Sequence, residues 1–313
     1  MHLCILFHGI NGSGDKMHNS VRFILIFAIC TSAYSADSLL YQYRLKLAEG
    51  GQFLSRGGND IPSALARFSM ANKIAADMNM ESADAHFWLA LANSDYGQDI
   101  PAIQHAKKAT QINPQYANAW ILLAQIYVKQ KKFDTDETEN AIREAMKLQP
   151  NDATILFIRG LTFYYGYNGN RKDDAIRAFQ EVLKINPNHL PALFYLGLCC
   201  FDLKYMSNAI SHFHKVVEQE PRHTEARFYY AVIYRQQPIT PQKIDIAEQQ
   251  FLLIIDKLDP NHAESHLQLG HLYQFDKPNR EKSILHYRRF LETAPLEHQW
   301  IPIVNQYLTG ITQ

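Results

Sequence analysis

The stretch LFYLGLCCFDLKYMSNAISHFHKVVEQEP, residues 193–221, decides the fold class of this chain. Its apolar residues recur at steps of three and four, first around Leu196 and Gly197 and again around Phe213. That spacing places them on one face of each of two helices. Pro221 ends the second helix, because a proline disfavours helical geometry in the residue before it. The stretch therefore predicts two helices that pack closely across the small residue Gly197.

The same arrangement recurs before other prolines of the chain. A small residue after an apolar one marks each first helix, and Ala or Ser followed by an aromatic residue marks most second helices. The copies are between 34 and 39 residues long, and they cover 83–116, 117–152, 153–189, 190–223, 224–262 and 263–296. A period of this length is typical of solenoids, in which helix pairs bury their faces against neighbouring pairs.

Each copy resembles the tetratricopeptide repeat (TPR), whose pattern is an aromatic residue or Leu, then Leu-Gly, Tyr, Ala, Phe and Pro. Trp120, Leu123, Ala124 and Tyr127 match the first half of that pattern best. The resemblance implies an all-α fold, a right-handed superhelical solenoid of antiparallel helix pairs. It also implies a protein that works by binding other proteins or peptides.

The two ends of the repeat region are expected to be atypical, because terminal repeats cap the stack. Residues 37–82 read as a degenerate helix pair, and residues 297–313 as a capping helix. In the N-terminal pair, glycines occur at positions 50, 51, 57 and 58. Glycine punctuates local structure, so we expect these four positions to lie in loose turns.

The opening stretch also contains a possible metal-binding set, Cys199, Cys200, His212 and His214. Cys200 occupies the core place that Tyr127 holds in its own copy, so we interpret it as a packing residue. The two histidines flank a core phenylalanine and point away from it. Metal ligands must converge on one point, and these diverge, so no metal site is predicted.

The N-terminus has the features of a secretory signal peptide at residues 17–36. Arg22 precedes a short apolar run at 23–30, and small residues follow. The run is shorter than the roughly 20 residues that span a bilayer; a buried N-terminal helix is the alternative. We expect a bacterial envelope protein, periplasmic or secreted, cleaved near 33–36. Residues 1–16 are then an upstream extension from a wrongly chosen start.

Other function classes find little support in the sequence. Lys+Arg and Asp+Glu both number 31, so no excess charge favours nucleic acid. A glycine-rich segment ends in Gly14-Asp15-Lys16, but Asp15 stands where a phosphate loop needs Lys and would repel phosphate. No catalytic constellation is recognisable. The sequence therefore predicts no enzyme, no cofactor and no nucleic-acid partner.

The resemblance implies that the first helices line a concave groove. We consider the positions one and two residues after the first core residue of each first helix, where most residues are apolar or aromatic. The candidates for a partner-binding groove are Phe87, Trp88, Leu122, Ile158, Phe194, Tyr195, Phe228 and Tyr229. Packing between neighbouring helices is the alternative for these positions. A contiguous apolar stripe would bind an apolar peptide, with Trp88, Tyr195 and Tyr229 as anchors.

The predicted function is therefore a non-enzymatic scaffold or assembly factor that binds an apolar segment of a partner protein in its concave groove. The alternative is a subunit that recruits substrate for an envelope enzyme, or that serves a pilus or cytochrome assembly machinery.

Overall fold

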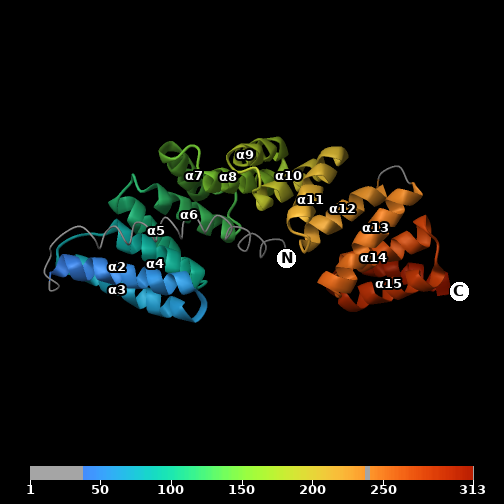
Figure 1. The fold of residues 1–313 in the computed structure, drawn as a ribbon, viewed down its shortest axis with the longest axis horizontal. Helices are drawn as coiled ribbons and strands as arrows, with labels where there is room; N and C mark the ends of the chain where they lie inside the picture. Colours follow the sequence, from blue (N-terminus) through green and yellow to red (C-terminus); the bar gives the residue numbers. More distant parts are fainter. Residues whose placement is uncertain (1–37, 237–239, 313) are drawn as a thin grey trace. The chain divides into compact units, whose positions relative to one another are not determined.

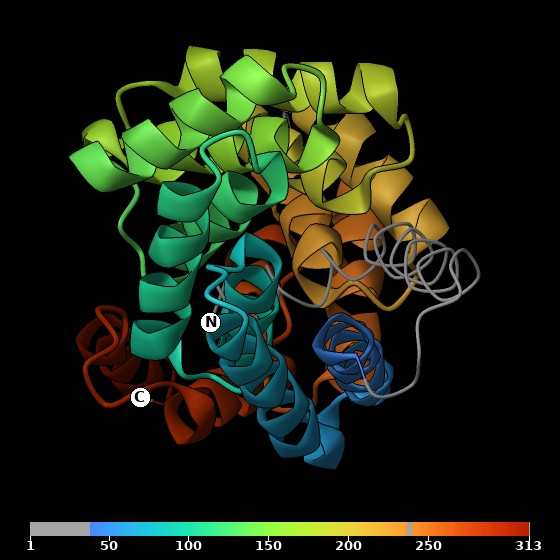
Figure 2. The same cartoon turned by 90° about the vertical axis from the view of Figure 1, so that its left-hand side faces the viewer.

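The computed structural model describes residues 38–236 and 240–312, and the predicted signal peptide lies outside them. In these ranges the chain forms fifteen α-helices and no strand, so the all-α prediction is confirmed. Two compact units divide between Pro191 and Ala192. Within each unit, successive helices pack side by side in antiparallel pairs (Figure 1 and Figure 2). Across the described residues, none of the helices has the length and apolar character that crossing a membrane requires.

The first unit consists of consecutive helix pairs, each joined by a short connection (Figure 1). Short 3-10 turns, η1 (Gly58–Asp60) and η2 (Tyr167–Gly169), lie within the first and the last of these connections. The pairs are α2 (Leu39–Arg56) with α3 (Ile61–Asp77), α4 (Ala83–Asp95) with α5 (Asp99–Ile112), α6 (Ala117–Lys129) with α7 (Asp136–Leu148), and α8 (Ala153–Tyr165) with α9 (Lys172–Ile185).

The second unit continues the same construction and ends with a single helix. Its helices are α10 (Leu190–Asp202), which begins just before the division, α11 (Met206–Gln219), α12 (Thr224–Gln236), α13 (Pro241–Leu253), α14 (Ala263–His271), α15 (Arg280–Thr293) and α16 (Ile301–Thr312). Two of these helices continue into a π-helical turn, α13 into η3 (Ile254–Leu258) and α14 into η4 (Leu272–Asp276).

The prolines of the repeats set the ends of the second helices. Helix α11 ends at Gln219, two residues before Pro221, and α15 ends at Thr293, two residues before Pro295. A proline restricts the residue before it to extended geometry, so the helix cannot reach it. The next helix of several pairs starts from a side-chain cap. At α4, the side chain of Ser82 accepts a hydrogen bond from the backbone N–H of Ala85 at 3.0 Å.

The two helices of a pair approach closely where a glycine of the first meets an aromatic ring of the second. A Cβ atom added at Gly160 would lie 2.4 Å from Phe179, and one added at Gly197 would lie 2.8 Å from Phe213. Real Cβ atoms do not come that close, so the rings occupy the space that the missing side chains leave. The close contact predicted at Gly197 is therefore present.

The prediction of loose turns in the N-terminal pair is wrong for two of its four glycines. Gly50 and Gly51 are buried inside α2. A Cβ added at Gly50 would lie 2.5 Å from Phe68 of α3, so this glycine serves close packing. Gly57 and Gly58 do form the turn, with φ angles of 65° and 54° that favour glycine.

Candidate functional site

The eight predicted groove residues are mostly covered. Those that are buried are Phe87, Leu122, Ile158, Phe194 and Tyr195. Those that are half-buried are Trp88, Phe228 and Tyr229. An exposed, contiguous apolar stripe is therefore not found at these eight positions, and a partner-binding role for them stays a prediction. The reason is packing between helices. It differs between the two positions considered in each first helix, which we call the first members (one residue after the first core residue) and the second members (two residues after it).

The first members lie in the interior of their own pairs. Phe194 contacts the ring of Phe213 at a centroid distance of 5.8 Å and that of His223 at 4.9 Å. Phe228 approaches Phe251, on its partner helix α13, at 5.8 Å. Aromatic rings at such distances stabilise a core beyond the area that they bury. These residues hold the two helices of a pair together.

The second members join consecutive pairs. Trp88 of α4 stacks on Phe68 of α3, with ring centroids 5.7 Å apart and planes within 15°. Tyr229 of α12 stacks in the same way on Phe213 of α11, at 5.4 Å and 14°. Each of these two rings therefore covers the aromatic ring that lies against the glycine of the preceding pair, which agrees with the alternative of packing between neighbouring helices.

The cysteine and histidine side chains of the opening stretch do not converge. Cys199 and Cys200 are buried and form no disulfide, and burial raises the pKa of the Cys200 thiol, which keeps it protonated. His214 is exposed and its Nδ1 lies 3.3 Å from Glu218. In the described part of the chain, no group of three or more His, Cys, Asp or Glu side chains could hold a metal ion.

Sequence reasoning missed two histidine pairs. The Nδ1 atoms of His86 and His105 lie 2.9 Å apart, and those of His266 and His286 lie 3.1 Å apart. Each pair joins the first helix of a copy to its second helix. Burial is the main cause that lowers the pKa of all four rings, and it lowers that of His286 to about 4. The rings are therefore neutral near pH 7, where one ring nitrogen donates to the other.

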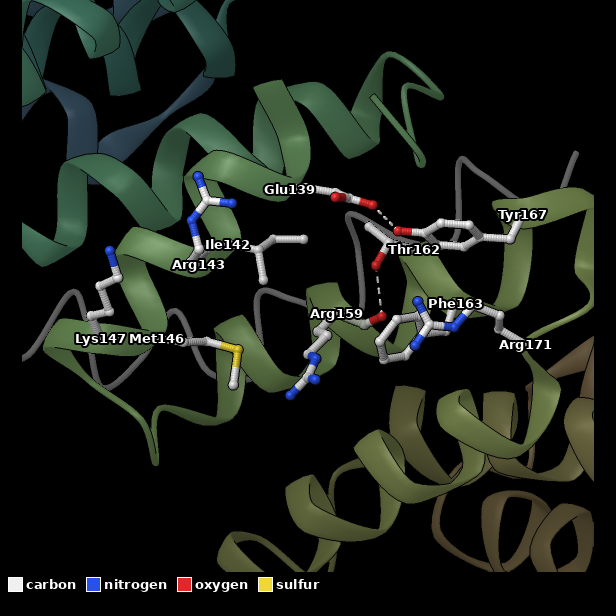
Figure 3. Close-up of a pocket in the computed structure, with 10 residues that line it drawn as sticks. All are labelled: Glu139, Ile142, Arg143, Met146, Lys147, Arg159, Thr162, Phe163, Tyr167 and Arg171. Atoms are coloured by element: carbon white, nitrogen blue, oxygen red, sulfur yellow. Dashed lines mark hydrogen bonds between the residues drawn. The ribbon is translucent and has the colours of Figure 1, made fainter. Parts of the chain in front are cut away.

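Sequence reasoning also missed a pocket between α7 and α8, which is open and has a volume of about 510 Å³ (Figure 3). Helix α7 supplies residues at helical spacings of three and four, so they share one face. The lining of this α7–α8 pocket consists of Glu139, Ile142, Arg143, Met146, Lys147, Arg159, Thr162, Phe163, Tyr167 and Arg171. It combines cations with apolar side chains that come from two predicted copies.

Comparisons with known proteins agree with this architecture. A family model described as tetratricopeptide repeat matches residues 164–213. The comparison with curated proteins found no match. Among solved structures, PilF of Pseudomonas aeruginosa is 19% identical over 73% of this chain and 96% of its own, with a TM-score of 0.59. A tetratricopeptide repeat protein from Parabacteroides merdae is 14% identical over 87% of this chain and 99% of its own, with a TM-score of 0.58.

PilW, described as a widely conserved type IV pilus biogenesis factor, is 16% identical over 71% of this chain and 98% of its own, with a TM-score of 0.58. At these identities the likeness concerns the fold. In this chain, glycines of first helices lie against aromatic rings of second helices, and prolines follow second helices. The family match therefore covers residues 164–213, and the described helices share the fold of solved tetratricopeptide repeat proteins.

Proposed function

We propose that this chain is a non-enzymatic scaffold that binds a segment of another protein along its first helices. The observation that carries the proposal is the fold itself, helix pairs of the tetratricopeptide type, which is suited to protein–protein interaction. Trp88, Phe228 and Tyr229 support it in part, because each residue is only half-buried. The buried residues among the eight predicted groove positions would shape the binding surface without contacting the partner themselves.

The proposal is tested with purified components. The full-length chain is used to isolate binding proteins from its own cells, and each candidate is then purified and titrated against it. The proposal expects at least one partner with saturable binding at a fixed stoichiometry and a micromolar or tighter dissociation constant. A survey in which no purified candidate binds, or in which the chain turns over a small molecule without a protein partner, would contradict it.

An assembly role is the second candidate function. It is favoured by the fold that the chain shares with PilF and PilW, of which PilW is described as a pilus biogenesis factor. Export through the segment at 17–36 belongs to the same proposal, since an envelope assembly factor must leave the cytoplasm. N-terminal sequencing of the protein from periplasmic or secreted fractions is expected to give a start near residues 33–36. Recovery of the uncleaved chain from the cytoplasm alone would contradict export.

A further inference from the structure

The α7–α8 pocket gathers positive charge that the described residues do not fully neutralise. Its lining contains four cations and one carboxylate, that of Glu139. Arg143 and Lys147 both form ion pairs with Glu144, at 3.6 and 2.8 Å. Ion pairs as exposed as these contribute little to stability. Arg159 forms no ion pair with any carboxylate in the ranges 38–236 and 240–312. Its charge is therefore available to a ligand.

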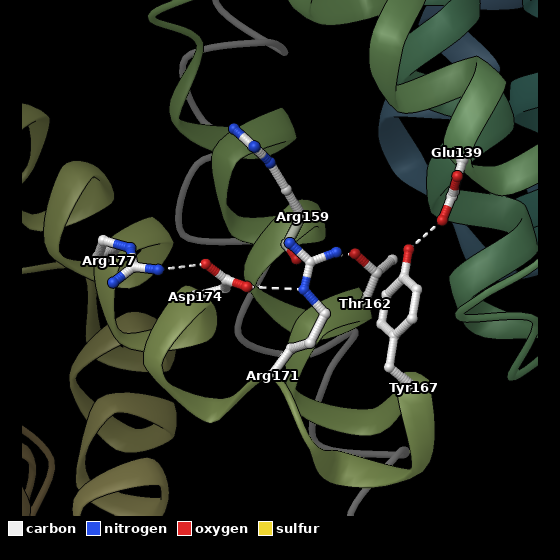
Figure 4. A network of polar contacts seen from close by, with 7 residues as sticks. All are labelled: Glu139, Arg159, Thr162, Tyr167, Arg171, Asp174 and Arg177. Carbon is white, nitrogen blue, oxygen red and sulfur yellow. Dashed lines mark hydrogen bonds and ion pairs between the residues drawn. The ribbon is translucent and has the colours of Figure 1, made fainter.

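Two arginines approach the same aromatic ring at the base of the pocket. The guanidinium carbon of Arg171 lies 4.1 Å from the centroid of Phe163, and that of Arg159 lies 5.2 Å from it. Arg171 also pairs with Asp174 at 2.7 Å, and Asp174 pairs with Arg177 as well (Figure 4). The charge of Arg171 is therefore balanced by Asp174, whereas that of Arg159 is not. A carboxylate beside Arg159 would make charge-assisted hydrogen bonds with its guanidinium group.

The rim of the pocket is held in place by an unusual turn. Tyr167 and Asn168 both have positive φ angles, 52° and 53°, which side-chain-bearing residues seldom adopt. The turn is fixed at two points, because the backbone N–H of Tyr167 donates to Asp134 at 3.3 Å and its hydroxyl donates to Glu139 (Figure 4). A strained turn that places one side chain at a pocket points to a functional role for that side chain. The pocket is thus built before any ligand arrives.

We propose that the α7–α8 pocket binds an acidic segment of a partner protein. A carboxylate of the segment would lie on Arg159, and an apolar side chain would cover Ile142, Met146 and Phe163. The carboxylate of Glu139 can accept a hydrogen bond from a peptide N–H, and the apolar side chains beside the cations suit a segment that carries both acidic and apolar residues. The pocket shares the first helix α8 with the surface assigned to the proposed function, but its other wall is the second helix α7, and its test does not depend on that proposal.

The test is calorimetric titration of the full-length chain with matched synthetic peptides at low salt. The probes are acetyl-EEFEE-amide, acetyl-QQFQQ-amide without the charges, and acetyl-EEAEE-amide without the ring. The acidic aromatic peptide is expected to bind at least about tenfold more tightly than either relative, and to weaken as salt is added. Equal binding of the charged and the uncharged peptide would overturn the proposal.

Matched variants locate the site. Arg159→Gln is expected to weaken acetyl-EEFEE-amide by at least about tenfold, equivalent to about 1.4 kcal/mol. Arg222→Gln, the same change at an exposed arginine between α11 and α12, is expected to leave affinity unchanged. Equal effects of the two variants would overturn the assignment to this pocket. So would full displacement of the peptide by an equal concentration of inorganic phosphate, since the pocket would then be a simple anion site.

Discussion

Phe213 occupies a point where three helices meet. Its ring fills the space beside Gly197 of α10, and it stacks on Tyr229 of α12. Phe68 has the same two relations in the first unit, with Gly50 and Trp88. One residue therefore closes its own pair and also joins that pair to the next. At these points the stability of a pair and the packing between pairs depend on the same ring.

We expect Tyr229→Ala to destabilise the protein. It removes a ring stacked on Phe213, and truncation of a large core aromatic typically costs about 3 kcal/mol, less where the ring is half-exposed. Urea denaturation measures the change in the free energy of unfolding. Tyr205→Ala, at a tyrosine that is 54% exposed, is the control and should change that free energy by less than about 0.5 kcal/mol. Equal, small effects of both substitutions would show that Tyr229 is a surface residue after all.

The glycines give a second prediction at this scale. Alanine is the better helix former by about 1 kcal/mol, yet a Cβ at residue 160 would lie 2.4 Å from Phe179. Overpacking of this kind typically costs about 1–3 kcal/mol, so Gly160→Ala should be destabilising on balance. Gly310→Ala in α16 meets open space and should be neutral or slightly stabilising. Thermal unfolding of both variants checks the difference, and stabilisation at residue 160 would refute the close contact.

At the scale of helices, the π-helical turn η4 absorbs a single extra residue in the repeat pattern. Each copy has a glycine or other small residue in its first helix and another small residue in its second helix. The two are Gly197 and Ala209 in one copy and Gly270 and Ser283 in another, where their separation in sequence is one residue longer. The extra residue falls where α14 widens into η4. The register is restored beyond the turn, since Ser283 Oγ donates to the carbonyl of Gly270 at 3.0 Å.

Helix pairing in the last copy should depend on pH through its histidines. Burial lowers the pKa of His271 and of His286 to about 4, below the value of about 6.5 that both have in an unfolded chain. As pH falls from about 6.5 to about 4, the unfolded chain takes up protons that the folded chain excludes. Stability is therefore complete above pH 6.5 and is lost through that window, by on the order of 3 kcal/mol for each ring.

Denaturation at pH 7 and at pH 4.5 measures this loss. His286→Gln removes one titrating ring beside His266 and should make the difference between the two pH values smaller. Asn208→Gln, at an exposed position of α11 without a titrating group, is the control and should leave that difference unchanged. A pH difference that is the same in all three proteins would mean that His286 does not couple folding to protonation.

The sequence predicted those features that depend on spacing within one copy. The ends of the second helices and the glycine contacts follow from the positions of Pro221 and Gly197. The stacking of Trp88 on Phe68 and of Tyr229 on Phe213 remained one of two alternatives, because it depends on the angle at which one pair meets the next. The histidine pairs and the α7–α8 pocket were missed for a related reason: their residues come from different helices and share no local pattern.

At the scale of the whole molecule, each unit is a series of pairs in which a helix contacts mainly its neighbours in sequence. Such arrays are stabilised by each repeat and by each contact between adjacent repeats, and they present many similar helix surfaces to solvent. Partner binding would then be distributed along one side of the array. The α7–α8 pocket would add a second, charged point of attachment, which can raise the affinity of a partner that reaches both.

Site-specific photo-cross-linking tests most directly whether partners bind along the first helices. A benzophenone amino acid is placed at Asn118, exposed on the first helix α6, or at Gln104, exposed on the second helix α5. The two replaced residues are both exposed amides, so the variants differ chiefly in the surface that carries the probe. With a purified partner, our account predicts a cross-linked product from position 118 and little from position 104. Cross-linking from position 104 alone would contradict it.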